Sequence, residues 1–386
     1  MSRDGRRRVL SRDIVASAAG GAIYALALGI ASVALPLLAL RAGYSAAGVG
    51  ALTAASAISQ LATRLILGAA MRRWPDWTLI AGATLLLAIS NGVVALSAAV
   101  VPFVVAQLLQ GVSRACFWTG SQTHVVRGPG RAASALATVN LVSSVGLLAG
   151  PVVAGVLSER DPVLALVAAA GIALIGMVPT FVLDRLPPFV PLTDPPPGRL
   201  WRRPGVNIGC WAGVTAGGWR GLLTSYVPVA LDGARQPAST IGALVAIANG
   251  AALVGAAVAG RVPRRRSRPV LLGGIVATGV ATALTAALAS HVVLSAAVLV
   301  ISGVAAGTLQ VLGPALAAET VHPEERGDAI AASGTFRAAA LFAAPLAVAG
   351  LVVVLPLAPA VALVGAAMTV PAVALRRRGS VPEFSA

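Results

Sequence analysis

Four arginines lie within long apolar stretches of this sequence, namely Arg64, Arg114, Arg220 and Arg337. A charged side chain at the centre of a membrane helix costs roughly 2.5–3.5 kcal/mol on insertion scales, so it is expected to face a cavity or a partner. All 13 acidic residues lie in loops or at the ends of expected helices, so none is expected beside these arginines. We expect Arg114 and Arg220, near the middle of their stretches, to bind a ligand. For Arg64 and Arg337 a structural role, with the head group bonded to backbone carbonyls, fits equally well.

Polar and aromatic residues accompany these arginines at helical spacing. One stripe, with steps of three or four residues, consists of Gln107, Gln110, Arg114, Trp118 and Gln122. A second stripe consists of Ser56, Gln60 and Arg64. A cavity lining accounts for this clustering, and ordinary packing with hydrogen bonds between helices is the alternative. The candidate substrate-binding residues are Tyr24, Gln60, Gln107, Arg114, Trp118, Gln122, Trp219, Arg220 and Tyr226.

Two ionisable residues, His124 and Glu319, occupy equivalent positions 195 residues apart. Because a histidine titrates near physiological pH, His124 is the better candidate for taking up and releasing a proton. A solvated histidine at a helix end is the alternative. The sequence shows no spacing typical of a metal site or of an activated nucleophile. We therefore expect no catalytic residues, no metal and no cofactor, and we do not expect an enzyme.

The elements that must position these residues are membrane helices. The chain is 57% hydrophobic and 11% charged, whereas a soluble domain is nearer half apolar and a quarter charged. About 20 apolar residues span a bilayer. Charges and turns divide the apolar sequence into twelve spans, at 14–40, 44–70, 77–98, 100–126, 132–157, 162–183, 206–231, 239–260, 269–290, 293–318, 327–352 and 354–375. The first span is too long for the apolar core of a cleaved signal peptide.

All 29 basic residues are arginine, and this limits both mechanism and topology. Without lysine the chain has neither a phosphate-binding loop nor a Schiff base, so we expect an ion or solute gradient to supply energy. The expected cytoplasmic segments carry 22 arginines, and the external loops carry only Arg41, Arg160 and Arg235. This asymmetry predicts a multi-pass protein of the cell inner (plasma) membrane with both termini in the cytoplasm. The net charge of +16 then reflects topology and attraction to anionic lipids, and we expect no nucleic-acid partner.

The chain divides into two related halves. A proline-rich cytoplasmic linker, 186–205, cannot continue a helix and separates residues 1–185 from residues 206–386. The first half recurs in the second about 192 residues later, where Gly68 matches Gly260. Many transporters build a central site from such duplicated units. We therefore expect an all-α membrane protein with twelve transmembrane helices in two pseudo-symmetric six-helix bundles.

The two central arginines break this internal symmetry. Arg114 aligns with Ala306, and Arg220 aligns with Leu28. Each arginine is therefore unique to its half of the chain. We expect the duplicated residues to form the moving scaffold and the unmatched residues to bind the ligand.

The fifth span carries the motif Gly146-x-x-x-Gly150-Pro151, followed by Gly155. Glycines four residues apart allow close helix packing, and a proline lets a helix bend. With this motif, twelve spans and a basic linker, the whole chain resembles the major facilitator superfamily. Within it, the chain resembles the twelve-helix drug:proton antiporter group, whose helix 5 carries a similar motif. The resemblance implies the major facilitator fold, with helices 4 and 7 around a central cavity.

The segment after the second span resembles the superfamily signature Gly-x-x-x-Asp-Arg-x-Gly-Arg. Gly68 and Arg73 match it, whereas Arg72 stands in place of the aspartate. The missing aspartate removes the usual charge relay, and a role of the arginines as cytoplasmic anchors is the alternative. The residues expected to act in gating or conformational change are Gly68, Arg72, Arg73, Gly146, Gly150, Pro151, Gly155, Gly260, Arg264 and Arg265.

These features together predict a secondary active transporter that works by alternating access. Arginines in place of a membrane carboxylate favour a neutral or anionic organic substrate, and the helix 5 motif favours efflux coupled to protons. Proton-coupled uptake of an organic anion is one alternative. A non-transporting receptor or scaffold on a transporter fold is another. The expected partners are a small-molecule substrate, protons and the lipid bilayer, and the protein is expected to be a monomer.

Overall fold

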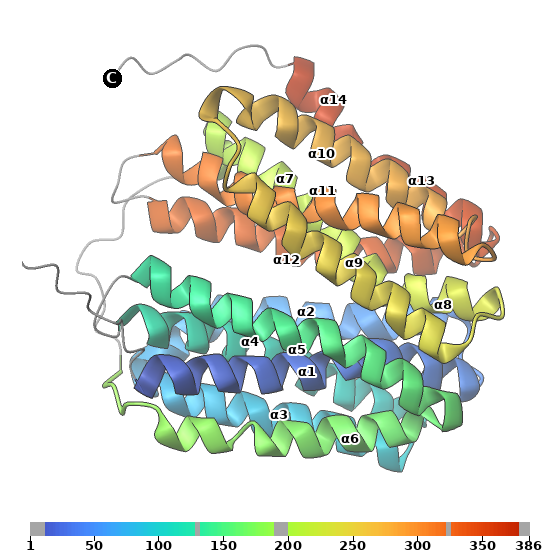
Figure 1. Cartoon of the computed structure of the whole chain (residues 1–386), viewed down its shortest axis with the longest axis horizontal. Coiled ribbons are helices and arrows are strands. Elements are labelled where there is room, and N and C mark those ends of the chain that lie inside the picture. Colours follow the sequence, from blue (N-terminus) through green and yellow to red (C-terminus); the bar gives the residue numbers. More distant parts are fainter. Residues whose placement is uncertain (1–11, 128–131, 189–199, 322–325, 378–386) are drawn as a thin grey trace, which may run out of the picture.

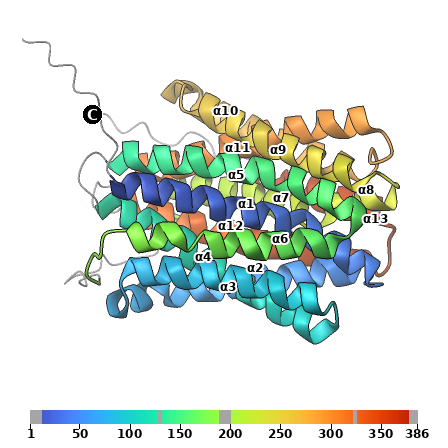
Figure 2. The same ribbon diagram turned by 60° about the horizontal axis from the view of Figure 1, so that its bottom comes forward.

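A computed structural model of the chain describes residues 12–127, 132–188, 200–321 and 326–377. These residues contain helices and no strand, and the helices run along one common direction in both views (Figures 1 and 2). The central part of the expected linker, 189–199, lies outside the described residues. The α-helices are α1 (Arg12–Arg41), α2 (Ala46–Arg73), α3 (Asp76–Leu96), α4 (Val100–Arg127), α5 (Ala132–Arg160), α6 (Pro162–Ile175), α7 (Pro204–Leu223), α8 (Tyr226–Gly233), α9 (Ala238–Ala259), α10 (Arg264–Thr285), α11 (Val292–Glu319), α12 (Arg326–Leu351), α13 (Leu357–Ala367) and α14 (Val370–Arg377).

The membrane character expected from the sequence is borne out by the helices. Eleven described helical segments are long and apolar enough to cross a bilayer. The expected span 206–231 forms two shorter helices, α7 and α8, and is not among the eleven. The expected all-α fold is confirmed.

Short connections join most consecutive helices, whereas the linker region separates α6 from α7. Asp161 caps the start of α6, where its Oδ1 accepts a hydrogen bond from the backbone N–H of Val163 at 2.9 Å. Pro162 follows at the first helical position, where the missing N–H costs nothing. We call the end of the bundle where α1 begins and α14 ends the termini side, and the opposite end the far side.

The helices form two groups, α1–α6 and α7–α14, which lie one below the other in Figure 1. Within the groups, α1 packs on α5, and α7 packs on α12. Between the groups, α5 packs against α9, and α2 packs against α12. The surface between the two groups is thus formed mainly by these four helices.

The glycine motif of α5 contacts both groups. A Cβ atom on Gly150 would lie 2.7 Å from the Cα of Gly29 in α1. A Cβ atom on Gly155 would lie 2.6 Å from the carbonyl oxygen of Ala238, at the start of α9. The first glycine therefore permits close packing inside one group, and the second permits close packing between the groups.

A pair of repeat-related glycines marks the same surface between the groups. Gly50 and Gly242 occupy equivalent places in the two halves of the chain. Any side chain on Gly50 would overlap the phenol of Tyr226 in α8, and any side chain on Gly242 would overlap the carbonyl of Pro151 in α5. Both contacts join the two groups toward the far side of the bundle.

Candidate functional site

A narrow cavity lies between the two groups of helices. The wall is built mostly by α1, α2 and α4, and the second group contributes Arg220 and Thr224. Its apolar surface includes Leu28, Leu35 and Phe103. The other half of the lining residues are polar or charged, and such a mixed wall suits a small organic molecule that carries polar groups.

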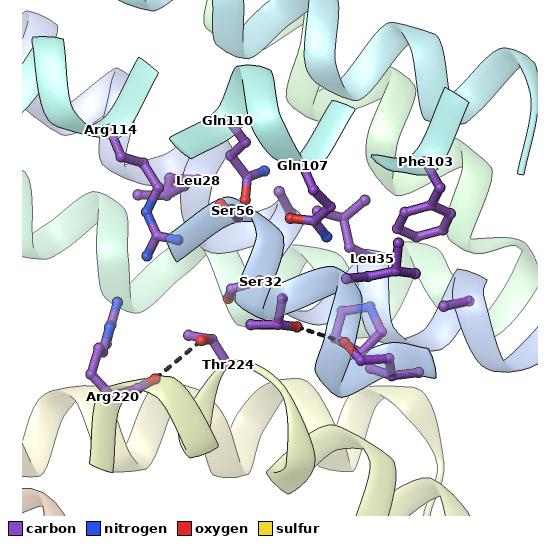
Figure 3. Close-up of a pocket in the computed structure, with 16 residues that line it drawn as sticks. Leu28, Ser32, Leu35, Ser56, Phe103, Gln107, Gln110, Arg114, Arg220 and Thr224 are labelled. Carbon is purple, nitrogen blue, oxygen red and sulfur yellow. Dashed lines mark hydrogen bonds between the residues drawn. The ribbon is translucent and has the colours of Figure 1, made fainter. Parts of the chain in front are cut away.

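Arg114 and Arg220 face each other across this cavity (Figure 3). Arg114 comes from α4 in the first group, and Arg220 comes from α7 in the second. The Nη1 of Arg220 donates a short hydrogen bond to the side-chain oxygen of Asn249 in α9. No hydrogen bond or ion pair holds the guanidinium of Arg114 within the described part of the chain. Arg114 therefore presents its donors to the cavity.

No carboxylate acts on these arginines among the described residues. Arg337 of α12 donates through Nη2 to the amide oxygen of Gln310 at 2.9 Å, so it too is held by a neutral amide. Arg114 interacts electrostatically with Arg64, and Arg220 interacts with Arg114 and Arg337. Like charges repel strongly in a poorly solvated interior. The site thus carries uncompensated positive charge.

Further polar atoms near the cavity lack partners among the described residues. Gln110 and Ser56 both line the cavity. The side-chain nitrogen of Gln110 and the hydroxyl of Ser56 are buried and make no hydrogen bond within the described part of the chain. The side-chain oxygen of Gln60, four residues after Ser56 in α2, is also buried without a partner. Buried polar groups are normally paired, so unpaired ones at a cavity indicate capacity to bind a ligand or water.

Of the nine candidate substrate-binding residues, Gln107, Arg114 and Arg220 line the cavity. Gln60 is buried beside it, and Gln122 is exposed elsewhere on α4. Trp219 is 2% exposed and belongs to the apolar core.

The candidate aromatic residues pack against other side chains. Tyr24 stacks on Phe117 with ring centroids 3.7 Å apart, and its hydroxyl lies 2.8 Å from the hydroxyl of Ser113. Trp118 meets both rings edge-on. Tyr226 is 1% exposed and packs against Gly50. These aromatic residues do not line the cavity, and neither does Trp219.

Several cavity residues were not among the candidates, namely Ser32, Thr53, Ser56, Phe103, Gln110 and Thr224. The stripe on α4 that contains Gln107 and Arg114 also contains Gln110, so helical spacing could have identified that residue. Hydroxyl side chains give a weaker signal, because they also bond to their own helix. Ser32, for example, donates to the carbonyl of Gly29 at 2.7 Å.

A second polar cluster lies on the termini side, around His124 of α4. Its Nε2 lies 3.0 Å from Oδ1 of Asp13 in α1 and forms a hydrogen bond. Its Nδ1 lies 3.2 Å from Oδ2 of Asp76 in α3. Since the His124 side chain is 0% exposed, the alternative of a solvated histidine is wrong.

The His124 cluster also contacts the segment that follows α6, the last helix of the first group. Arg127 pairs with Oδ2 of Asp76 at 3.2 Å and donates to the carbonyl of Pro187 at 2.6 Å. The backbone N–H of Asp184 donates to Oδ1 of Asp13 at 3.0 Å. The cluster therefore joins the beginnings of α1 and α3, the end of α4 and the segment after α6.

The remaining coupling candidate and the described arginine side chains among the gating candidates are exposed, whereas Gly150 and Gly155 pack against other helices. Glu319 is exposed on α11, in the other group from His124, so the two coupling candidates are not brought together. Arg72, Arg73 and Arg265 are exposed on the termini side. The side chain of Arg264 lies outside the part of the chain that the structure describes, and so do the surroundings of Gly68.

Comparison with protein families gives a match over most of the chain. The model described as "Major Facilitator Superfamily" matches residues 17–345 and again residues 209–382. A curated protein of Metarhizium rileyi (strain RCEF 4871), the MFS-type transporter ppzB, is 35% identical over 98 residues. This alignment covers 25% of the present chain and spans only 20% of that relative's length.

Comparison with solved structures shows the same fold at low sequence identity. A point mutant of the nucleoside transporter NupG matches with a TM-score of 0.76 and 14% identity, over 94% of this chain and 99% of that chain. A second structure of NupG matches with a TM-score of 0.75 and 13% identity, over 94% and 98% of the two chains. At such identity the likeness concerns the fold alone.

Proposed function

The chain belongs to the Major Facilitator Superfamily, and on this premise we propose that it exports a small anionic or neutral organic compound by alternating access, in exchange for protons. Membership of this family and the eleven apolar helices make the protein a secondary transporter of the MFS type that is embedded in a lipid bilayer. The substrate class, the direction and the coupling ion belong to the proposal. The antiporter-like motif at Gly146, Gly150, Pro151 and Gly155 supports exchange with protons.

The main support for the proposal is that Arg114 and Arg220 face each other across the cavity. Each group of helices contributes one guanidinium to the cavity, and no described carboxylate neutralises either of them. An anionic group held between them would join the two groups of helices and remove the repulsion between the two charges. A cation would instead add to the uncompensated positive charge. An organic anion is therefore the preferred form of the substrate.

Alternating access requires two bodies that rock around the cavity. We take residues 1–185 and 206–386 as these bodies, in agreement with the duplicated sequence. The arginine distribution supports a cytoplasmic termini side in the cell inner membrane. The contacts of Gly50 and Gly242 would then close the external side of the cavity.

For proton coupling, His124 is the candidate that the structure favours over Glu319. Its three charged neighbours, Asp13, Asp76 and Arg127, together carry a net charge of −1, which one proton on the imidazole would balance. The cluster lies apart from the cavity, so coupling would be transmitted through α4, which carries both His124 and Arg114.

A binding screen with purified protein tests the substrate class. We expect organic anions to raise the unfolding temperature, because a ligand that binds only the folded state stabilises it. Arg114→Gln and Arg220→Gln should each weaken this binding about tenfold or more, since each removes a charged hydrogen-bond donor. The panel includes lipophilic cationic dyes and, in view of the fold shared with NupG, nucleosides as neutral compounds. Tight binding of cationic dyes, with anion binding unchanged in Arg114→Ala, would contradict the proposal.

Transport in proteoliposomes under a pH gradient tests direction and coupling. Antiport moves a labelled anion toward the acidic compartment, and symport moves it toward the alkaline one. Movement toward the acidic side supports export in exchange for protons. Movement toward the alkaline side supports proton-coupled uptake instead. A receptor or scaffold would give no counterflow at all.

A further inference from the structure

The mechanism proposed above uses two of the four arginines within the helices and leaves Arg64 and Arg337 without a role. Arg64 belongs to α2 in the first group, and Arg337 belongs to α12 in the second. These two helices pack against each other across the surface between the groups. Arg64 and Arg337 therefore repeat the arrangement of Arg114 and Arg220, with one guanidinium from each group.

The second pair lies nearer the termini side than the first. Arg337 is 11 residues into α12 and Arg220 is 16 residues into α7, which corresponds to depths of roughly 16 and 24 Å. Arg64 is nine residues from the end of α2 and Arg114 is 13 from the end of α4, or roughly 14 and 20 Å. The two pairs are thus separated along the bundle by roughly 6–8 Å.

The charge of this second pair is also uncompensated. Arg337 interacts electrostatically with Arg64 and Arg114, and it donates a hydrogen bond to the neutral amide of Gln310. Arg64 is exposed, and within the described part of the chain neither a hydrogen bond nor an ion pair holds it. Two cations that approach each other without an acidic partner are stabilised by an anion between them.

A polar stripe connects the two pairs. Ser56 lines the central cavity, and Gln60 and Arg64 follow at successive intervals of four residues on the same face of α2. The side chains of Ser56 and Gln60 each carry a buried oxygen without a partner. An anion with polar substituents would therefore meet hydrogen-bonding groups along the whole distance between the two pairs.

We propose that Arg64 and Arg337 form a second anion-binding site, which the organic anion occupies on its way between the termini side and the central pair Arg114–Arg220. The site takes carboxylate, sulfate or phosphate groups, because a guanidinium binds all three with two parallel hydrogen bonds. This inference rests on the proposed anionic substrate. The anion would then bind at two successive sites, first at one arginine pair and then at the other.

The test uses the purified full-length chain and radiolabelled sulfate as the probe, measured by equilibrium binding at fixed ionic strength. Four proteins are compared: the unchanged chain, Arg114→Gln/Arg220→Gln, Arg64→Gln/Arg337→Gln, and the chain with all four substitutions. Arg266→Gln is the matched control, since it removes one exposed arginine outside the cavity. We expect the central double variant to keep sulfate binding, and the fourfold variant to lose it by about tenfold or more.

Each outcome decides between the two proposals. If the central double variant binds no sulfate while the unchanged chain does, the second site is refuted and the central site stands. If the unchanged chain binds no anion, the proposed substrate class fails as well. If sulfate binding in the central double variant disappears when anionic lipid replaces neutral lipid in nanodiscs, Arg64 and Arg337 hold a lipid headgroup, and the path is refuted. Retained folding of every variant is checked by its unfolding temperature.

Discussion

At the scale of single residues, the structure assigns different environments to groups that look alike in the sequence. The acids at helix ends include Asp13 and Asp76, which are 7% and 1% exposed, and the backbone N–H of Asp184 in the segment after α6 donates to Asp13. Burial of both carboxylates is compatible with folding because His124 contacts both of them and Arg127 pairs with Asp76. A buried charge without its partner would be costly.

His124→Gln tests this balance. Loss of the imidazole leaves two buried carboxylates with Arg127 as the only cation of the cluster, so we expect a loss of about 3–5 kcal/mol of stability. The double variant His124→Gln/Asp76→Asn should lose less than the sum of the two single variants, because the two residues are coupled. Thermal and denaturant unfolding of the purified protein measure both effects.

Asp161→Asn is the matched control for that experiment. Like Asp76→Asn, it neutralises a carboxylate at a helix start, but asparagine caps a helix nearly as well as aspartate, so little change in stability is expected. Equal losses in His124→Gln and in Asp161→Asn would show that the His124 cluster contributes nothing specific.

At the scale of helices, the positions of glycines separate packing within a group from packing between groups. Gly150 permits the approach of α1 to α5, which belong to the same group. Gly242 permits the approach of α9 to α5, which belong to different groups. A methyl group at the two positions should therefore have different consequences.

Gly242→Ala should shift the balance between conformations, because its methyl group overlaps the carbonyl of Pro151 only while the far side is closed. Gly150→Ala should reduce the unfolding temperature without such a shift. Spin labels at Ala99 and Ser290, both exposed on the far side, report the distance between the groups. Gly82→Ala is the control, since nothing lies within 4 Å of its added methyl group. A longer distance between the labels in Gly150→Ala than in Gly242→Ala would contradict the prediction that Gly242, and not Gly150, limits the separation of the two groups.

At the scale of the whole molecule, charge and apolar length determine how the protein sits in a membrane. The eleven apolar helices lie along one direction, and the loops of the termini side carry most of the arginines. We predict that the termini side faces the cytoplasm, because arginine-rich loops tend to stay inside.

Labelling of single cysteines in intact cells tests this orientation. In a chain with Cys116 and Cys210 replaced by alanine, Ala99→Cys should react with a membrane-impermeant maleimide from outside. Arg266→Cys should react only after the membrane is permeabilised. The opposite pattern would reverse the orientation and, with it, the interpretation of transport as efflux.

Much of this protein is determined by the sequence alone. Apolar length and the positions of charges and prolines establish the number and limits of nearly all membrane helices, because a bilayer accepts few other structures. The arginine distribution predicts orientation, and an uncompensated charge in an apolar stretch predicts a cavity. Helical spacing correctly brought Gln107 and Arg114 to one wall of that cavity.

The tertiary structure alone decided which side chains face one another. Tyr24, Trp118, Trp219 and Tyr226 were candidates for lining the cavity, yet they pack against other side chains and neighbouring helices instead. The buried pairing of Asp13 and Asp76 with His124 joins residues that are 111 and 48 positions apart from it in sequence. Periodicity along one helix gives the face of a residue relative to its own axis, but the rotation of that helix against its neighbours is determined by packing. For this reason the arginines could be identified from the sequence, whereas their arrangement as pairs across the two groups required the fold.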